Sequence, residues 1–543
     1  LPHGVQKLTT GKALIKYFCT PCAKTITNGG RTRNLPEHDP AKWELFVEYN
    51  RQDVVTEMEI ERRLSRFPVP EQVQREWEYD MRISARGVAA DRELVDGALY
   101  CGTAIEEAAK QEAIELTGLE NPKSREQMLT WLQGHGVAIP DLRSATVEDA
   151  LEHKDEFEPD VARVLELRQL LSKASIKKYS TVVTTMCEDG RIRGLLQFYG
   201  ANRTGRWAGR LVQVQNLPRT YLHGAMLDTA RDLTRRKLPE GLKLLYGSVP
   251  GTLSQLVRTA LVPRPGCKFV DADFSAIEAR VVAWLAGEEW VLQVFRTHGK
   301  IYEATASQMF GVPLDRIVKG NPEYALRQKG KVATLALGYQ GGSSALIAMG
   351  ALKNGLTEEE LPDIVSRWRQ ANRAIVRCWK AVEQAAIQAV ETGRSCATHG
   401  LVFAREADID SGLDFLTIRL PSGRKLYYAQ PHFGVNQWGG KQLRYYGMNQ
   451  MTKKWSVIET YGGHMTENIV QAIARDCLAV NIERLENAGF PIVFHIHDEV
   501  VIEVPEDRAD LDEVTRIMGQ PIEWAPGLPL AADGWVGDYF TKD

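Results

Sequence analysis

The stretch 269–281, FVDADFSAIEARV in one-letter code, constrains the fold of this chain more than any other feature. It begins as an apolar strand that ends near Asp273, and the residues that follow predict a helix with Glu278 in its first turns. Far downstream, Asp498 lies between two β-rich runs within residues 491–504, which predicts a hairpin with this acid at its turn.

Two carboxylates held on rigid elements can bind a pair of divalent cations about 3.5–4 Å apart, an arrangement that suits phosphoryl transfer. Asp273 and Asp498 would both be surrounded by apolar strand residues, so their charges need partners such as cations. Either acid alone is more often an unrelated surface residue at the end of a strand. As a pair with a basic helix between them in the sequence, they favour a metal site.

The basic helix is predicted over residues 324–339. Arg327, Lys331, Leu335 and Tyr339 recur at every fourth position, so on a helix all four would lie on one face. Two cations on such a face can clamp a triphosphate, and the apolar and aromatic side chains further along can meet a base and a sugar. A purely structural helix remains the alternative, because the stripe alone is weak evidence.

Two further basic regions are candidates for contacts with a phosphate backbone. The first holds Arg203, Arg206, Arg210 and Arg219, with Gln215 and Asn216 as polar neighbours. The second is the end of a long helix predicted over residues 159–179, with Lys173, Lys177 and Lys178. A solvated loop and a helix end that complements its own dipole are the respective alternatives.

Bulk composition agrees with a globular protein of several domains. The chain has 543 residues, 44% of them hydrophobic, and a net charge of −3, so any nucleic acid would have to be held by local basic patches. It has no apolar run long enough for a membrane span, no signal peptide, and eight cysteines without a disulfide pattern, which favours a cytoplasmic location. Cys19 and Cys22 form a lone CxxC, expected to be structural thiols. The start at Leu1 suggests a missing upstream segment.

Three motifs in a fixed order resemble the family A DNA polymerases, the bacterial DNA polymerase I type, and most of all their bacteriophage members. Residues 273–280 are similar to the first motif of that family, and residues 497–499 are similar to the third. The second motif is matched by Arg327, Lys331, Tyr339 and Gly341 at their spacing in this sequence. The resemblance covers roughly residues 70–543. It implies an α+β fold with a right-hand architecture and an antiparallel palm sheet. The implied division of the chain is 1–67 as the remnant of an RNase H-like exonuclease domain, 68–200 as mainly thumb, 201–290 as palm, 291–455 as fingers and 456–543 as the second part of the palm.

The resemblance also implies roles. Asp273 and Asp498 would bind two Mg²⁺, for which Mn²⁺ can substitute, with Glu499 supporting the site. Glu278 would exclude ribose, and Lys331 would be a candidate general acid. The residues expected to bind the incoming dNTP are Arg327, Lys331, Leu335, Tyr339, Glu278 and Tyr302. Those expected to bind primer-template DNA are Arg206, Arg210, Gln215, Asn216, Gln471, His497, Lys173 and Lys177.

Three positions depart from the pattern of the family. Leu335 stands where an aromatic residue is usual, Tyr302 where a histidine is usual, and Glu467 where an asparagine precedes the contact glutamine. Near the N-terminus, Tyr49 and Asp53 are similar to the last exonuclease motif, whereas the upstream acids of that active site are not recognisable in residues 1–48. The chain alone is therefore not expected to proofread.

A monomeric, template-directed DNA polymerase of phage replication is the leading interpretation, and the sequence identifies no processivity partner. A single-subunit RNA polymerase relative is one alternative, against which Glu278 argues. A catalytically inactive DNA-binding homologue is the other. The presence of Asp273, Asp498, Arg327 and Lys331 argues against the loss of catalytic activity that this alternative requires.

Overall fold

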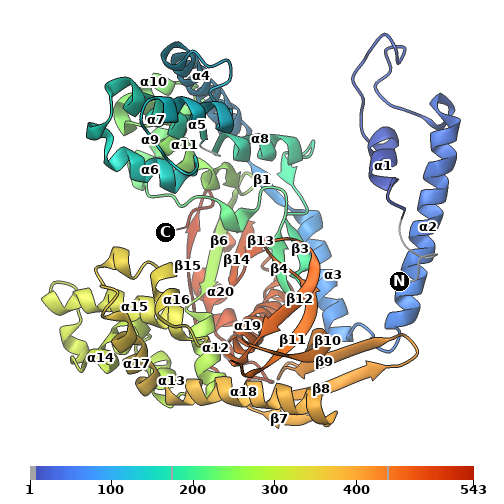
Figure 1. Ribbon diagram of the computed structural model, residues 1–543, viewed down its shortest axis with the longest axis vertical. Coiled ribbons are helices and arrows are strands. Elements are labelled where there is room, and N and C mark those ends of the chain that lie inside the picture. Colours follow the sequence, from blue (N-terminus) through green and yellow to red (C-terminus); the bar gives the residue numbers. More distant parts are fainter. Residues whose placement is uncertain (1–7, 173–174, 437–438, 543) are drawn as a thin grey trace.

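The computed structural model of the protein describes residues 8–172, 175–436 and 439–542. Figure 1 shows a lobe of helices above a central sheet, a second helical lobe below it, a larger sheet beside that lobe, and a pair of N-terminal helices standing apart from the rest. None of the helices in the described ranges is long and apolar enough to cross a membrane.

The central sheet is antiparallel and has the strand order β13-β14-β6-β15. Its core strand is rich in apolar residues, and Phe269, Val270 and Ala272 are fully buried in it. The predicted strand-to-helix unit and the predicted hairpin are both confirmed. The elements are β6 (Cys267–Phe274), α12 (Ile277–Ala286), α19 (Gly462–Asn487), β13 (Ile492–Ile496), β14 (Glu499–Pro505), α20 (Leu511–Met518) and β15 (Ala532–Gly537).

The upper lobe packs around α4, whose first turn is capped by Asp91 through the backbone N–H of Leu94. The described part of the predicted helix 159–179 forms two helices, and the second one continues to Thr185. Residues 224–256, which lie within the segment 201–290 expected to be palm, form three helices that pack against α4. The elements are α4 (Arg92–Thr117), α5 (Arg125–Gly134), α6 (Ser144–Glu152), α7 (Pro159–Ser172), α8 (Ser175–Thr185), α9 (Gly224–Arg235), α10 (Pro239–Tyr246) and α11 (Val249–Leu256).

The lower lobe is built on the close pair α14 and α15. Gly330 permits this approach, because a Cβ there would lie 2.2 Å from the carbonyl oxygen of Tyr302. The predicted helix 324–339 is too long: a 3₁₀ turn precedes α15, which ends at Leu337, so Tyr339 lies beyond it. The elements are α13 (Glu289–Thr297), α14 (Ile301–Phe310), α15 (Leu326–Leu337), α16 (Ser343–Ala348), α17 (Leu361–Ala371) and α18 (Arg373–Thr392).

A six-stranded antiparallel sheet follows α18 in the chain. β9 and β10 form a hairpin whose turn holds Ser422 and Gly423, and Gly423 takes a φ of 89° there. The strands are β7 (Cys396–Thr398), β8 (Leu401–Asp408), β9 (Leu413–Arg419), β10 (Lys425–Val435), β11 (Lys441–Met448) and β12 (Trp455–Thr460).

The N-terminal part contains a long helix, α2, which is capped at its start by Asp39. Tyr49 on this helix packs against Gly11, and a hydrogen bond to Asp53 raises the pKa of the Tyr49 phenol.

All eight cysteines are free thiols, in agreement with the expectation that Cys19 and Cys22 are not disulfide-bonded. The elements are α1 (Gly11–Cys19), α2 (Pro40–Leu64), α3 (Glu71–Arg86), β1 (Val88–Ala90), β2 (Arg191–Ile192), β3 (Leu196–Ala201), β4 (Arg206–Gly209) and β5 (Leu261–Val262).

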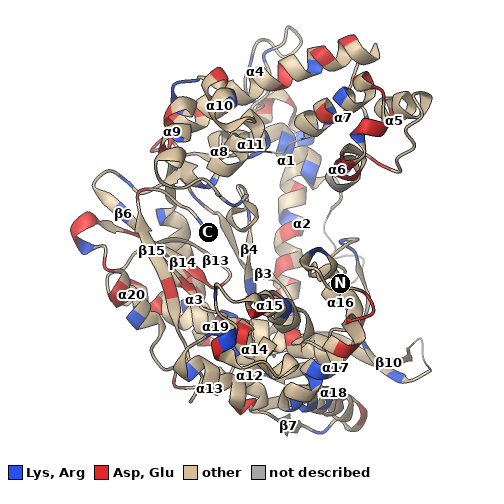
Figure 2. Ribbon diagram, turned by 90° about the vertical axis from the view of Figure 1, so that its left-hand side faces the viewer, with Lys and Arg blue, Asp and Glu red and all other residues tan. Residues whose placement is uncertain are grey.

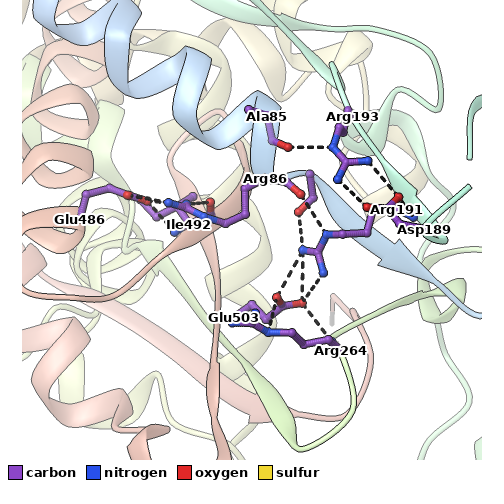
Figure 3. A network of polar contacts seen from close by, with 10 residues as sticks. Ala85, Arg86, Asp189, Arg191, Arg193, Arg264, Glu486, Ile492 and Glu503 are labelled. Carbon is purple, nitrogen blue, oxygen red and sulfur yellow. Dashed lines mark hydrogen bonds and ion pairs between the residues drawn. The ribbon is translucent and has the colours of Figure 1, made fainter. Parts of the chain in front are cut away.

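A network of arginines ties α3 and β2 to the central sheet (Figure 3). Glu503 on β14 is 2% exposed and accepts hydrogen bonds from the guanidinium of Arg191 at 3.3 Å and from the backbone N–H of Arg264 at 3.0 Å. Arg86 at the end of α3 pairs with Glu486 on α19 at 2.7 Å. Buried charges of this kind are costly unless they are paired, so these contacts fix the strand that also carries Glu499.

A second buried network fixes α19 and the loop before β4. Arg475 is fully buried, donates to the carbonyl oxygen of Gly205 at 3.0 Å and pairs with Glu76 on α3. The neighbouring Asp476 accepts from Arg424 at 2.7 Å. The network therefore holds Arg206, the residue after Gly205, beside the middle of α19.

Acid should destabilise the fold through His495 on β13. Its ring is buried edge-on against Trp207 at a centroid distance of 4.6 Å, and burial, helped by Arg475 and His497, lowers its pKa from 6.5 to about 3. The unfolded chain takes up this proton first, so the stabilisation is complete above pH 6.5 and is lost as the pH falls toward 3.

The expected loss is about 1.4 kcal/mol of unfolding free energy for one pH unit below 6.5, measured as a shift of the urea midpoint between pH 7.5 and pH 5.5. His495→Phe should reduce that shift, and the same change at the exposed His298 should not. An unchanged shift in His495→Phe would show that other groups cause the acid sensitivity.

Candidate active site

The two predicted acids meet at one end of the central sheet. β14 pairs with β6 so that Glu499 lies opposite Asp273, and the backbone N–H of Phe274 donates to the carbonyl oxygen of Asp498 at 3.1 Å. The turn before β14 contains His497 with a φ of 52°, a left-handed conformation that closes the tight connection between β13 and β14. The strand end and the hairpin turn thus bring Asp273, Asp498 and Glu499 side by side.

Negative charge is concentrated here. Burial and the nearby charge of Asp273 raise the pKa of Asp498 to about 7. Burial also raises the pKa of Asp273, although Lys542 opposes this, and it raises the pKa of Asp271 on the same face of β6. Oδ1 of Asp273 is buried and has no hydrogen-bond partner among the described residues. Such a cluster favours the binding of cations.

Sequence reasoning missed Lys542. Its Nζ lies 3.0 Å from Oδ2 of Asp273 and 2.7 Å from Oε2 of Glu499. Burial alone would lower the pKa of Lys542, but the charges of Glu499 and Asp273 raise it overall. No local pattern around Lys542 could have indicated this contact, because it depends on where the chain runs after β15.

The residues present fit Mg²⁺. Within the described part of the chain, no three Asp, Glu, His or Cys side chains form a group that could hold a metal ion. Mg²⁺ rarely needs such a cage, because it is usually bound through one or two carboxylates together with water and substrate phosphates. Asp273 with its unpartnered Oδ1 and Asp498 beside it offer that kind of incomplete ligand set.

Glu278 is held by two residues from distant segments. Arg206 donates to its Oε1 at 2.7 Å, and the phenol of Tyr339 donates to its Oε2 at 2.8 Å. Arg280 on the same helix donates instead to the carbonyl oxygens of Ser275 and Pro529. Each oxygen of the Glu278 carboxylate thus accepts a hydrogen bond, which fixes the orientation of the side chain.

A cavity of about 440 Å³ reaches from Asp498 to the lower lobe. Asp498, Glu278 and Leu335, which is 47% exposed, are among its lining residues, whereas Asp273 and Glu499 are not. The remaining lining residues include Tyr302, Thr334, Tyr339, Glu467 and Gln471. Residues predicted from three separate motifs therefore share one cavity.

The cations on α15 lie beside this cavity. Arg327 pairs with Glu303 on α14 at 2.8 Å, a contact that the sequence did not indicate. The ring of Tyr302 lies 5.4 Å from the Arg327 guanidinium and 5.9 Å from Nζ of Lys331. Tyr302 therefore supports both cations through its ring.

The other predicted DNA-binding residues lie on several elements. Arg210, Asn216, His497 and Lys177 are exposed, and Lys173 lies outside the described residues. The side chain of Gln215 packs against Gly209, and Gln471 donates to Glu467 at 3.3 Å. Figure 2 shows basic and acidic residues interspersed over both lobes, so attraction of a polyanion would be local.

Comparison with known proteins agrees with this geometry. A family model described as DNA polymerase family A matches residues 101–401. The chain is 52% identical over 544 residues to a DNA polymerase of Bacillus phage SP02, covering 100% of this chain and 82% of that protein. It is 26% identical over 293 residues to the thermostable DNA polymerase I of Thermus aquaticus, covering 53% of this chain and 28% of that protein.

Among solved structures, the POL domain of Pol1 from M. smegmatis in complex with DNA primer-template and dNTP matches with a TM-score of 0.56 at 18% identity, covering 98% of this chain and 79% of that one. The fold is therefore that of a polymerase domain. The chain belongs to DNA polymerase family A. The family match ends before the hairpin that carries Asp498, but the phage relative aligns across it.

Proposed function

We propose that this DNA-directed DNA polymerase extends the 3′ end of a primer on a DNA template with dNTPs, using two Mg²⁺ held by Asp273 and Asp498. The observation that carries the proposal is the shared cavity, which is lined by Asp498, Glu278 and residues of the lower lobe. Two such ions, when bound, activate the attacking hydroxyl and neutralise charge on the reacting and leaving phosphates.

The side chains of the chain do the rest. Arg327 would leave its ion pair with Glu303 and bind the triphosphate instead. Lys331 would donate a proton to the leaving pyrophosphate. Tyr339 would lie beside the templating base, while Arg206 and Gln471 would contact the nascent pair. Arg210, Gln215, Asn216, His497 and Lys177 would contact the primer-template.

Domain roles follow as part of the same proposal. The upper lobe of α4 to α11 would be the thumb, the central sheet the palm, and α13 to α17 the fingers. Residues 1–67 would be the remnant of an exonuclease domain, with Tyr49 and Asp53 from its last motif. The phage relative supports a role in phage DNA replication in the cytoplasm of a host cell.

Template-directed primer extension tests the proposal. With Mg²⁺ and a single dNTP, the enzyme should add that nucleotide only when it complements the template base, and a second template with a different base should reverse the choice. Addition without regard to the template, or a preference for NTPs, would contradict the proposal.

Replacing Glu278 by alanine should weaken discrimination against ribonucleotides. The carboxylate lies at the cavity and is held rigid by Arg206 and Tyr339, so a 2′-hydroxyl placed against it would clash. We expect the ratio of kcat/KM for dNTP over NTP to fall on the order of 100-fold in steady-state extension. Glu289→Ala, an exposed change on α13, is the control, and an unchanged ratio in Glu278→Ala would exclude this role.

A further inference from the structure

The last described residues of the chain reach the carboxylate centre. After β15, the fully buried Phe540 packs against Phe494 at a ring distance of 5.1 Å, and its backbone N–H donates to the carbonyl oxygen of Leu261 at 3.0 Å. This anchor lies two residues before Lys542. Core packing of Phe540 therefore brings the backbone of Lys542 close to the carboxylates, and Figure 1 shows this end of the chain beside β15 and β6.

The contact of Lys542 differs from an ordinary surface ion pair. Its side chain is 32% exposed, and its partner Glu499 is 1% exposed. The ammonium bridges Glu499 to Asp273 on the neighbouring strand, so one cation neutralises acids from both motifs. Pairs exposed to solvent contribute little, whereas partly buried charges in such a cluster interact more strongly.

We propose that Lys542 is an internal counter-cation that competes with metal ions for the active-site carboxylates and so sets the metal concentration that the enzyme needs. The inference rests on the proposed function, because it takes Asp273 as a metal ligand. The Nζ contact uses Oδ2 of Asp273, so a metal ion bound through that oxygen has to displace the ammonium or share the oxygen with it. A second positive charge nearby also repels the metal ion.

Competition of this kind would couple metal binding to substrate. Phosphate oxygens of a dNTP add ligands that Lys542 does not occupy, so metal ions would bind well only when the triphosphate arrives with them. Lys542 is thus a positioning residue for the charge balance of the site, and Glu499, which keeps its contact at 2.7 Å, would retain the lysine when Asp273 turns to the metal.

Electron paramagnetic resonance of Mn²⁺ tests the inference on the full chain without DNA. The part of the Mn²⁺ binding that is lost in the Asp273→Ala variant is taken as binding at the active site. Lys542→Met should lower the dissociation constant of that fraction about tenfold, since it removes the competing charge. The Mg²⁺ concentration for half-maximal primer extension should fall in parallel. Lys542→Arg keeps the charge and should stay close to the unmodified protein.

Lys268→Met is the matched control. Lys268 lies on β6, the strand that carries Asp273, but it pairs with Asp538 at 2.6 Å, away from the site. It should leave Mn²⁺ binding unchanged. Unchanged or weaker Mn²⁺ binding in Lys542→Met, with normal primer extension, would overturn the inference and leave the proposed function intact. If neither Mn²⁺ binding nor extension depended on Asp273, the proposed function itself would fail.

Discussion

Replacing Asp273 or Asp498 with alanine should lower the single-turnover rate of primer extension by on the order of 10³–10⁴-fold. The two acids lie at the ends of hydrogen-bonded neighbouring strands, and burial together with mutual repulsion makes their negative charges costly without cations. Removing one of them should leave too few ligands for two ions. Rapid-quench measurements with saturating dNTP and Mg²⁺ give the rate.

Binding of primer-template should survive in both variants, because the proposed contacts with DNA phosphates are made by basic residues elsewhere. Fluorescence anisotropy of labelled DNA checks this. Asp512→Ala, an exposed acid on α20, is the matched control and should extend primers normally. An Asp273→Ala or Asp498→Ala enzyme that extends at the unmodified rate would show that these acids do not hold the catalytic metal ions.

Lys331→Met should lower the rate of nucleotide addition roughly 10²–10³-fold. Lys331 lies beside the ring of Tyr302 on the face of α15 that carries Arg327 and Leu335. A methionine keeps the length and the packing but can neither neutralise the triphosphate nor donate a proton to the leaving pyrophosphate. The loss should therefore appear in the maximal single-turnover rate as well as in the affinity for dNTP.

Lys329→Met is the control for Lys331, since it lies on the same helix but pairs with Glu360 at 3.3 Å. Its rate should stay within a few-fold of the unmodified enzyme. If Lys331→Met changed only the affinity for dNTP and not the maximal rate, Lys331 would bind the triphosphate without acting as a general acid.

Local pattern was enough to predict the parts of the fold that carry the acids. The apolar run before Asp273 and the alternation around Asp498 each specify a strand or hairpin through short-range preferences. Their positions in order along the chain then matched a family pattern, and the pairing of β14 with β6 brought the two acids together.

Other features depend on tertiary contacts that no window of sequence contains. The spacing of four through Tyr339 suggested one continuous helix, but α15 ends at Leu337, and Tyr339 reaches Glu278 from the segment that follows. Residues 224–256 pack against α4, a contact between segments far apart in the chain that no local pattern indicates. The contact of Lys542 with Asp273 and Glu499 is likewise visible only in the folded chain.

Crystals of the enzyme with primer-template, a non-hydrolysable dNTP and Mn²⁺ would test the central claim most directly through anomalous scattering. The account predicts two Mn²⁺ peaks about 3.5–4 Å apart, both within ligand distance of Asp273 and Asp498. Manganese bound at the triphosphate without contact to either carboxylate would contradict it.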